Sequence, residues 1–249
     1  EEDLVELKEN LGNMTFEQLK QLDGLSSDRA DIIVPALEVF TTLMAVVGTT
    51  SFQLSKKGLR EGLIIDRVIQ GDAEAFDKYN VFAENARRLA FEYGRSEEET
   101  KTLASLSKQL YVECCRLKVF TFNEEDLELI QRAAKVFSIG EYIELDSSSQ
   151  HTFYLLANQS IAGMNHLNRV KLALLASYKN RDYFRRFATP FMSWFTREEL
   201  KDLRDFGALL KFVYALNVSK RNLVKKVKLE LVQDIIHIHI VTREPAMAE

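Results

Sequence analysis

The sequence predicts a mainly helical protein with a short α/β segment near its N-terminus and a β-hairpin at its C-terminus. Only three prolines and ten glycines occur in 249 residues, which is typical of long helices with short joints. Apolar residues recur with helical spacing through most of the chain, whereas the C-terminal end alternates strictly between apolar and polar residues. We therefore expect three parts, which are residues 1–70, 71–222 and 223–249.

The first part is expected to contain two helices, a strand and a third helix. Thr15 is the expected N-cap of MTFEQLKQL, and DIIVPALEVFTTLMAVVG is expected to form a helix that ends at Gly48. That helix is apolar nearly all round, so we expect it to be buried. SFQLS is the strand candidate, and Gly58 and Gly62 bracket the turn into the next helix. One strand cannot make a sheet, so its partners are expected elsewhere.

The middle part is expected to be almost wholly helical, and the last part to be a hairpin. The segments LDSSSQ and NRDYFRRFATPF are the expected loops of the helical part. VKLELV and IIHIHIV both alternate, and Gln233 and Asp234 between them read as a hairpin turn. The expected helices are 72–94, 97–117, 124–137, 150–159, 166–180 and 197–217.

Composition indicates a cytoplasmic protein. Apolar residues make up 46% of the chain and charged residues 28%, which suits a packed core with a solvated surface. We find neither a run of eighteen apolar residues nor a secretory leader, and we expect no membrane contact. Cys114 and Cys115 are adjacent, and neighbouring cysteines rarely reach disulfide geometry, so a reducing compartment is expected. The chain begins EEDLVEL without methionine, from which we expect a fragment or a processed chain.

The net charge of −4 conceals two regions of opposite sign. Residues 1–163 hold 17 basic and 28 acidic side chains, whereas residues 164–232 hold 15 basic and 6 acidic ones. A basic region on an acidic protein is typical of a surface that faces a polyanion. A solvated helical face is the alternative, and composition does not separate the two.

Two linked motifs carry a family resemblance. GLREGLIID (residues 58–66) and DRADIIVPALEVFTTLMAVVG upstream resemble motifs of the exopolyphosphatase and guanosine pentaphosphate phosphohydrolase (Ppx/GppA) family. The resemblance implies that residues 1–70 are the tail of the second actin-like lobe, with the catalytic and phosphate-binding parts lying upstream. A buried Arg60–Glu61 pair between two glycines would be costly unless both charges found partners, so we expect this pair to pin the turn. Arg29 is expected to grip phosphate near the cleft between lobes, and helix capping of Asp28 or Asp31 is the alternative.

The helical part resembles the family's HD-phosphohydrolase-like domain, which holds a divalent metal with His and Asp from separate helices. FAENARRLA has Phe82 in place of the first ligand histidine, and AAKVFSIGEYI has Phe137 and Ser138 in place of the His-Asp pair. SSSQHTFYLLAN keeps His151, with serines where further histidines often stand. Phenylalanine has no lone pair, and a serine hydroxyl replaces a carboxylate poorly. We expect an HD-like fold without its metal site.

The remaining candidates favour structural roles. His166 opens a helix, where it can help to cap it. His237 and His239 share one strand face, a geometry that suits two metal ligands, but no third ligand is near in sequence, so an exposed hairpin face is expected. Cys114 and Cys115 are expected to pack in the core. No catalytic residue is assigned within the chain, because no phosphate loop, nucleophile elbow or paired-carboxylate motif is present.

The resemblance predicts an exopolyphosphatase-type phosphohydrolase that uses magnesium and acts on polyphosphate or guanosine pentaphosphate. This C-terminal portion is expected to serve substrate grip and homodimer contact, without specific nucleic-acid binding. The alternative is a non-enzymatic helical module that binds a nucleotide or a protein partner. The expected phosphate-binding residues are Arg29, Arg181, Arg185, Arg186, Lys220, Arg221 and Lys225.

Overall fold

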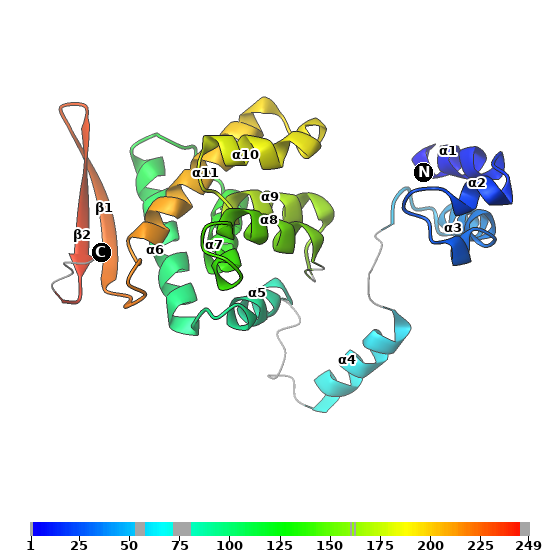
Figure 1. Cartoon of the computed structure of the whole chain (residues 1–249), viewed down its shortest axis with the longest axis horizontal. Coiled ribbons are helices and arrows are strands. Elements are labelled where there is room, and N and C mark those ends of the chain that lie inside the picture. The colour runs from blue at the N-terminus through cyan, green and yellow to red at the C-terminus, as the bar shows by residue number, and fades with distance from the viewer. Residues whose placement is uncertain (1, 53–57, 72–80, 160, 162, 245–249) are drawn as a thin grey trace. The chain divides into compact units, whose positions relative to one another are not determined.

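The computed structural model describes residues 2–52, 58–71, 81–159, 161 and 163–244 (Figure 1). The chain divides into two compact units, Glu1–Ile65 and Asp66–Glu249. The first unit begins with four helical segments, which are α1 (Glu2–Gly12), α2 (Phe16–Lys20), the 3-10 segment η1 (Ser27–Arg29) and α3 (Ile33–Val47).

The first unit has a small core between α1, α2 and α3. Leu11, Leu19 and Leu37 are buried there, and α1 packs along α3. Thr15 is the N-cap of α2, as the sequence predicted: its hydroxyl accepts the Gln18 N–H, and the Gln18 side chain accepts the Thr15 N–H in return. These contacts stabilise a short helix that has little propensity energy of its own.

Helix α3 is where the burial prediction is wrong. It ends at Gly48, which adopts the predicted left-handed conformation with φ +70°. Leu37 and Met44 are buried, but Val39 and Val46 are 66% and 79% exposed. The reason is geometric, because the partners in this unit cover one stripe of a helix that is apolar on all sides.

The helix after Gly58 also differs from the prediction. In α4 (Leu59–Gly71) the Glu61 carboxylate accepts the Gly58 N–H at 2.9 Å, which places an acid at the positive end of the helix. Arg60 is exposed and Glu61 is half-buried, so the expected buried Arg-Glu pair is wrong. The Glu61 carboxylate binds a free N–H group at the start of α4, and it can do so at the surface without a buried partner. Most of the predicted SFQLS strand lies outside the described residues.

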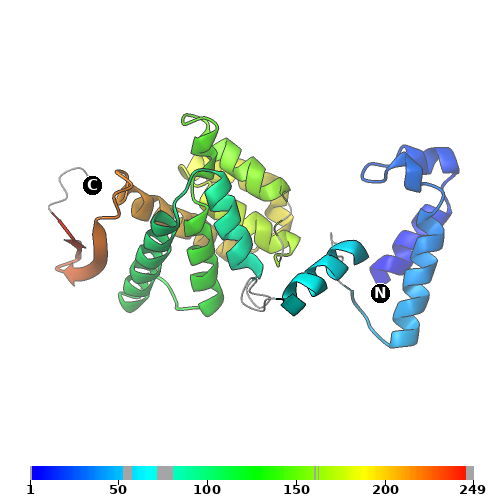
Figure 2. The ribbon, with the colours of Figure 1, turned by 90° about the horizontal axis from the view of Figure 1, so that it is seen from below.

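The second unit is a helical body with a hairpin at one end, on the side of α6 (Figures 1 and 2). Its central helix, α9, is buried on nearly every side from Val170 to Ala176 and packs against α7, α8 and α11. In the described part of the chain, no helix has the length and apolar character needed to cross a membrane. The helical segments of this body are α5 (Val81–Glu92), α6 (Glu97–Arg116), α7 (Glu124–Lys135), η2 (Ile139–Tyr142), α8 (Ser148–Asn158), α9 (His166–Ala176), α10 (Arg181–Ala188), η3 (Thr189–Trp194) and α11 (Arg197–Ala215).

The segment NRDYFRRFATPF is helical and not the predicted loop. The Asn180 side chain caps α10 by accepting the N–H groups of Asp182 and Tyr183 at 3.1 and 3.0 Å. Phe184 and Ala188, four residues apart, are both buried and anchor the helix to the body. The arginines between them made the segment look polar, although its apolar residues keep helical spacing.

The C-terminal hairpin forms as predicted. Strands β1 (Val224–Val232) and β2 (Ile235–Thr242) pair antiparallel, and Val232 lies opposite Ile235. Gln233 and Asp234 have φ values of +48° and +64°, the left-handed pair that a two-residue turn between twisted strands requires. One face of β1 packs on α6.

Replacing Gly140 with alanine should destabilise the helical body. An added Cβ would lie 2.3 Å from the Ser148 carbonyl oxygen and 2.5 Å from the Thr152 nitrogen, and these backbone atoms cannot move aside easily. We expect a loss of about 2 kcal/mol or more in the free energy of unfolding, measured with denaturant. Gly62→Ala is the matched control in α4: its Cβ meets no atom within 4 Å, so it should leave stability unchanged or slightly raised. Equal effects of both substitutions would contradict the packing at η2.

Candidate functional site

A buried guanidinium organises the centre of the helical body. Arg95 follows Gly94, whose φ of +73° ends α5 and turns the chain into α6. The Arg95 side chain pairs with Glu99 one turn into α6, and the two residues are only 5% and 3% exposed. Ser96 caps α6 by accepting the Glu99 N–H at 3.1 Å, which fixes the direction in which Glu99 leaves the helix.

Arg95 also reaches two segments that are distant in sequence. Its Nη2 lies 3.1 Å from the Phe137 carbonyl oxygen and 3.3 Å from that of Ser138. The same nitrogen lies 3.3 Å from Glu141 Oε2 and 3.0 Å from the Tyr214 hydroxyl on α11. We refer to Arg95, Glu99, Ser138, Glu141 and Tyr214 as the Arg95 cluster.

The groups of the Arg95 cluster satisfy one another. Tyr214 donates to Glu141 Oε2 at 2.5 Å, and the Ser138 hydroxyl donates to Glu141 Oε1 at 3.0 Å. Burial raises the pKa of Tyr214 to about 12, so its hydroxyl stays protonated and remains a donor. Burial alone would lower the pKa of Arg95, but Tyr214 and Glu99 outweigh burial and the net shift is upward. The cluster therefore holds a permanent cation against two carboxylates.

The Arg95 cluster includes the turn at Phe137 and Ser138, where the family resemblance places the His-Asp pair of an HD site. Phe137 is 4% exposed and its ring lies 5.2 Å from that of Tyr214, so it serves as packing. Ser138, with φ +56°, turns the chain so that its carbonyl and that of Phe137 both reach Arg95. These side chains do not fit a divalent metal, since they supply neither imidazole nor free carboxylate. Among the described residues, no three His, Cys, Asp or Glu side chains form a metal-binding group.

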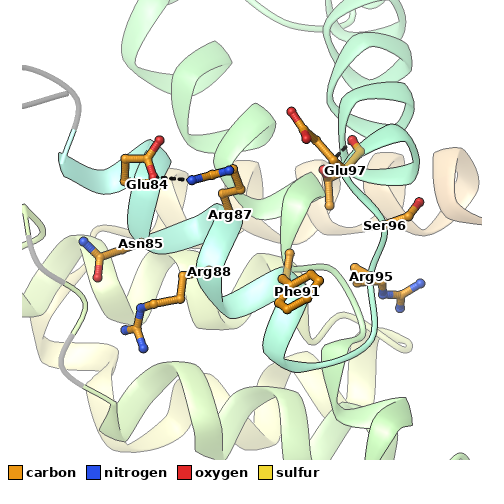
Figure 3. Close-up of a pocket in the computed structure, with 10 residues that line it drawn as sticks. Glu84, Asn85, Arg87, Arg88, Phe91, Arg95, Ser96 and Glu97 are labelled. Atoms are coloured by element: carbon orange, nitrogen blue, oxygen red, sulfur yellow. Dashed lines mark hydrogen bonds and ion pairs between the residues drawn. The ribbon is translucent and has the colours of Figure 1, made fainter. Parts of the chain in front are cut away.

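A hollow of about 540 Å³ lies beside the cluster, between α5 and the start of α6 (Figure 3). Phe91 is 79% exposed and gives this hollow an apolar surface. Arg87 pairs with Glu84 at 2.9 Å, and Arg88 pairs with Glu92 at 2.7 Å. Because each of these arginines already has an acidic partner, the hollow offers no concentrated positive charge to an anion.

The predicted phosphate-binding arginines lie together on α10. Arg181 and Arg185 are exposed and one turn apart, so they project from the same side of the helix, and Arg186 is exposed beside them. Phe184 is turned into the body. Three guanidinium groups on one short helix can contact neighbouring phosphates of a flexible chain.

The predicted lysines lie at a second place, where α11 joins β1. Lys220 and Asn222 both have a φ of +57°, and the buried Asn217 side chain accepts the Asn222 N–H at 2.9 Å. Arg221 pairs with Glu244 at 3.3 Å. Helix α10 packs on α9 and η3, whereas this junction adjoins α6, so the predicted basic residues of the second unit form two groups.

The second group includes cations that sequence reasoning missed. A hollow of about 330 Å³ lies between α6 and the hairpin, where Lys225 is joined by Lys101 and Arg243. Thr102 and Ser105 add hydroxyl groups to its wall. Lys101 is 2.7 Å from Glu97, and Arg243 is 4.0 Å from Glu98, which offsets part of the positive charge. Lys101 lies in an acidic stretch of sequence, so only the fold reveals its neighbours.

Comparison with known proteins agrees with this architecture. Residues 81–248 match the family model for Ppx/GppA phosphatase domain III, and residues 1–70 match the model for the Ppx/GppA phosphatase family. The chain belongs to the Ppx/GppA phosphatase family. The Arg95 cluster, both basic groups and the hairpin all lie in its domain III.

Three curated relatives carry the name guanosine-5'-triphosphate,3'-diphosphate pyrophosphatase. The Vibrio atlanticus protein is 23% identical over 158 residues, covering 63% of this chain and 31% of the relative. A Vibrio cholerae protein is 25% identical over 153 residues, covering 60% and 29%. The Vibrio campbellii protein is 24% identical over 168 residues, covering 66% and 32%. The chain thus spans about a third of the length of each of these relatives.

The other residues singled out in the sequence have ordinary surroundings. Arg29 ends η1 and is exposed, and its assignment to an interlobe cleft stays a prediction. The cap of α9 is Asn165 and not His166, whose ring lies 5.2 Å from that of Trp194. Burial raises the pKa of the Cys114 thiol to about 11, which makes it a poor nucleophile.

The histidines that were considered as metal ligands lie on β2 and α8. His237 and His239 lie on the exposed strand β2, and His239 contacts Glu230 at 3.0 Å. His151 is half-buried on α8. The side chain of Phe82 lies outside the described residues. The absence of a metal in domain III stays a prediction.

Replacing Arg95 with methionine should destabilise domain III strongly. The substitution leaves Glu99 buried without its cation, and breaking a buried pair in this way costs about 3–5 kcal/mol. Arg88→Met is the control, because Arg88 is exposed and its pair with Glu92 contributes about 1 kcal/mol or less. Chemical denaturation of both variants tests this, and Arg95→Met with Glu99→Gln should recover part of the loss. If Arg95→Met unfolded like Arg88→Met, the cluster would not hold the domain together.

Proposed function

We propose that the complete protein is a phosphohydrolase that cleaves phosphoanhydride bonds. Its substrate is polyphosphate, from which it releases terminal orthophosphate, or guanosine pentaphosphate, from which it releases the 5′-phosphate. The observation that carries this proposal is the match of two consecutive parts of the chain to the Ppx/GppA family models. The names of the Vibrio relatives support the guanosine substrate.

Within that protein, we propose that domain III grips the substrate and leaves catalysis to other parts. Phe137 and Ser138 stand where an HD-type reaction needs metal ligands. In contrast, α10 and the junction of α11 with β1 expose several basic side chains. Arginine binds phosphate oxygens with a planar fork, and lysine supplies mobile charge along a flexible polyanion. A site that binds polyphosphate at a distance from the reacting bond favours long polyphosphates over short ones. A solvated surface is the competing interpretation of the same charge.

The remaining parts of this proposal follow from the family. We propose that the enzyme is a cytoplasmic homodimer that uses magnesium and binds no nucleic acid sequence specifically. No residue described here is assigned to the magnesium ion. A non-enzymatic role for domain III, binding a nucleotide or a protein partner, is favoured by the same loss of donor side chains at Phe137 and Ser138. Phosphate release by the complete protein would exclude a purely non-enzymatic function.

Replacing Arg181, Arg185 and Arg186 with glutamine should weaken polyphosphate binding. Because binding releases counterions, affinity should fall steeply with salt, and three phosphate contacts contribute a log–log slope of about 2 by analogy with single-stranded nucleic acid. The triple variant should lose that part of the slope. A titration of labelled polyphosphate at two or more salt concentrations measures both quantities.

Two further variants make the binding test specific. Arg67, Arg87 and Arg88 replaced with glutamine remove the same charge from exposed positions on α4 and α5, and should leave affinity nearly unchanged. Lys101, Lys225 and Arg243 replaced with glutamine test the hollow at the hairpin. Equal losses in all three variants would indicate a general charge effect. No detectable binding at low salt would leave the basic region as solvated surface.

A further inference from the structure

The two outer edges of the C-terminal hairpin differ in whether their backbone groups have hydrogen-bond partners. Along β1, side chains of α6 satisfy the outward backbone groups. Gln109 accepts the Val227 N–H at 3.2 Å, and Glu113 accepts the Leu229 N–H at 2.8 Å. Arg116 donates to the Leu229 carbonyl oxygen. The helix thus closes this edge as another strand would.

The edge of β2 remains open. Val232 and Ile235 flank a two-residue turn and form a hydrogen-bonded pair, and such pairs alternate along an antiparallel ladder. Ile236, Ile238 and Ile240 therefore direct their N–H and C=O groups away from β1. Their partners on β1 show the same pattern, because the N–H groups of Val227 and Leu229 point away from β2 and toward α6. Within the described residues, no side chain or other strand bonds to the outward groups of these isoleucines.

The side chains of β2 favour pairing of the open edge with another strand. Ile236, Ile238 and Ile240 lie on the face that β1 packs against α6, yet they are 47%, 45% and 43% exposed. The strand IIHIHIVT contains no Lys, Arg, Asp, Glu or Pro. Exposed edge strands are normally protected by such residues, because an open edge accepts another strand.

We propose that this edge pairs with β2 of a second copy of the chain, in an antiparallel arrangement about a two-fold axis. This inference deepens the homodimer of the proposed function and supplies its interface. A second copy fits for two reasons. The strand has no formal charge apart from its imidazoles, so two copies bring no like charges together. The isoleucines of β2 also stand at even-numbered positions, so two antiparallel copies of the strand can place isoleucine opposite isoleucine.

The register follows from the outward groups. Ile236, Ile238, Ile240 and Thr242 turn their backbone groups away from β1. The register that pairs isoleucine only with isoleucine places Ile238 opposite Ile238 of the partner subunit. Ile236 then faces Ile240 of the partner subunit, and each such pair shares one side of the sheet. The result is a four-stranded sheet with a continuous isoleucine face between the two α6 helices. The opposite face brings His237 beside His239 of the partner subunit.

The same geometry limits assembly to a dimer. In the part of the hairpin that the structure describes, each copy has one open edge, because α6 closes the other. A two-fold contact between two identical open edges consumes both of them and leaves nothing for a third copy. Side-by-side addition into longer sheets is thereby excluded.

Sedimentation velocity of the 249-residue chain tests the interface. We expect a discrete dimer at micromolar concentration, and a monomer after Ile238→Lys, which places two ammonium groups on the axis. Val232→Lys is the matched control, because Val232 is 43% exposed on the same hairpin but belongs to β1; it should remain dimeric. A monomeric parent chain, an open-ended polymer, or an Ile238→Lys variant that stays dimeric would overturn the proposal. Circular dichroism of each variant shows whether the hairpin folds.

A cysteine at the axis provides a second test that does not depend on disrupting the strand. In the proposed register the Cα atoms of two opposed residues at position 238 lie about 5.5 Å apart, within the range of a disulfide. Mild oxidation should therefore link Ile238→Cys into a covalent dimer, whereas Val232→Cys and the parent chain should stay largely unlinked. Equal cross-linking of all three would overturn the register. Polyphosphate binding by the monomeric Ile238→Lys variant is measured separately, so failure of the interface is distinguishable from failure of the proposed function.

Discussion

The buried charge of Arg95 is the constraint on which the arrangement of domain III depends. A guanidinium taken out of water must have every donor placed against an acceptor, or the desolvation penalty is not recovered. Its acceptors come from α6, from the turn at Phe137 and Ser138, and from Tyr214 on α11. Those segments must therefore keep fixed positions relative to the end of α5. The Ser96 cap fixes the start of α6, one turn before Glu99 meets Arg95.

This constraint links the fold to the proposed function. The Arg95 guanidinium contacts Phe137 and Ser138, the positions where the HD resemblance expects metal ligands. We propose that this cation keeps the helices in place and that they supply no reaction centre. The outer surfaces are then free to differ. The arginines of α10 lie on one of them, and the hairpin, fastened to α6 by Gln109 and Glu113, lies on another. We interpret domain III as a rigid support for binding and assembly, with its chemistry located elsewhere in the protein.

The sequence predicted those features whose cause is local. Alternation and the residues Gln233 and Asp234 were sufficient for the hairpin, and Thr15 and Gly48 marked helix ends correctly. Helix α10 was missed because its buried Phe184 and Ala188 are few and stand among arginines. The Arg95 cluster was also missed, since its members other than Glu99 lie 43 to 119 positions from Arg95 and nothing local marks Arg95 as buried. The exposed face of α3 could not be foreseen, because an apolar pattern does not tell which partners are present.

The central claim is that Arg95, and not a metal ion, holds the core of domain III together. The most direct measurement is the melting temperature of the 249-residue chain in a chelator, compared with the same chain in excess magnesium, manganese, iron or zinc. A bound metal at a hundred times its dissociation constant would add about 2.7 kcal/mol, which raises the melting temperature of a chain of this size by about 5–10 °C. The account predicts no difference among these conditions. A metal-dependent rise of that size, lost on chelation, would contradict it.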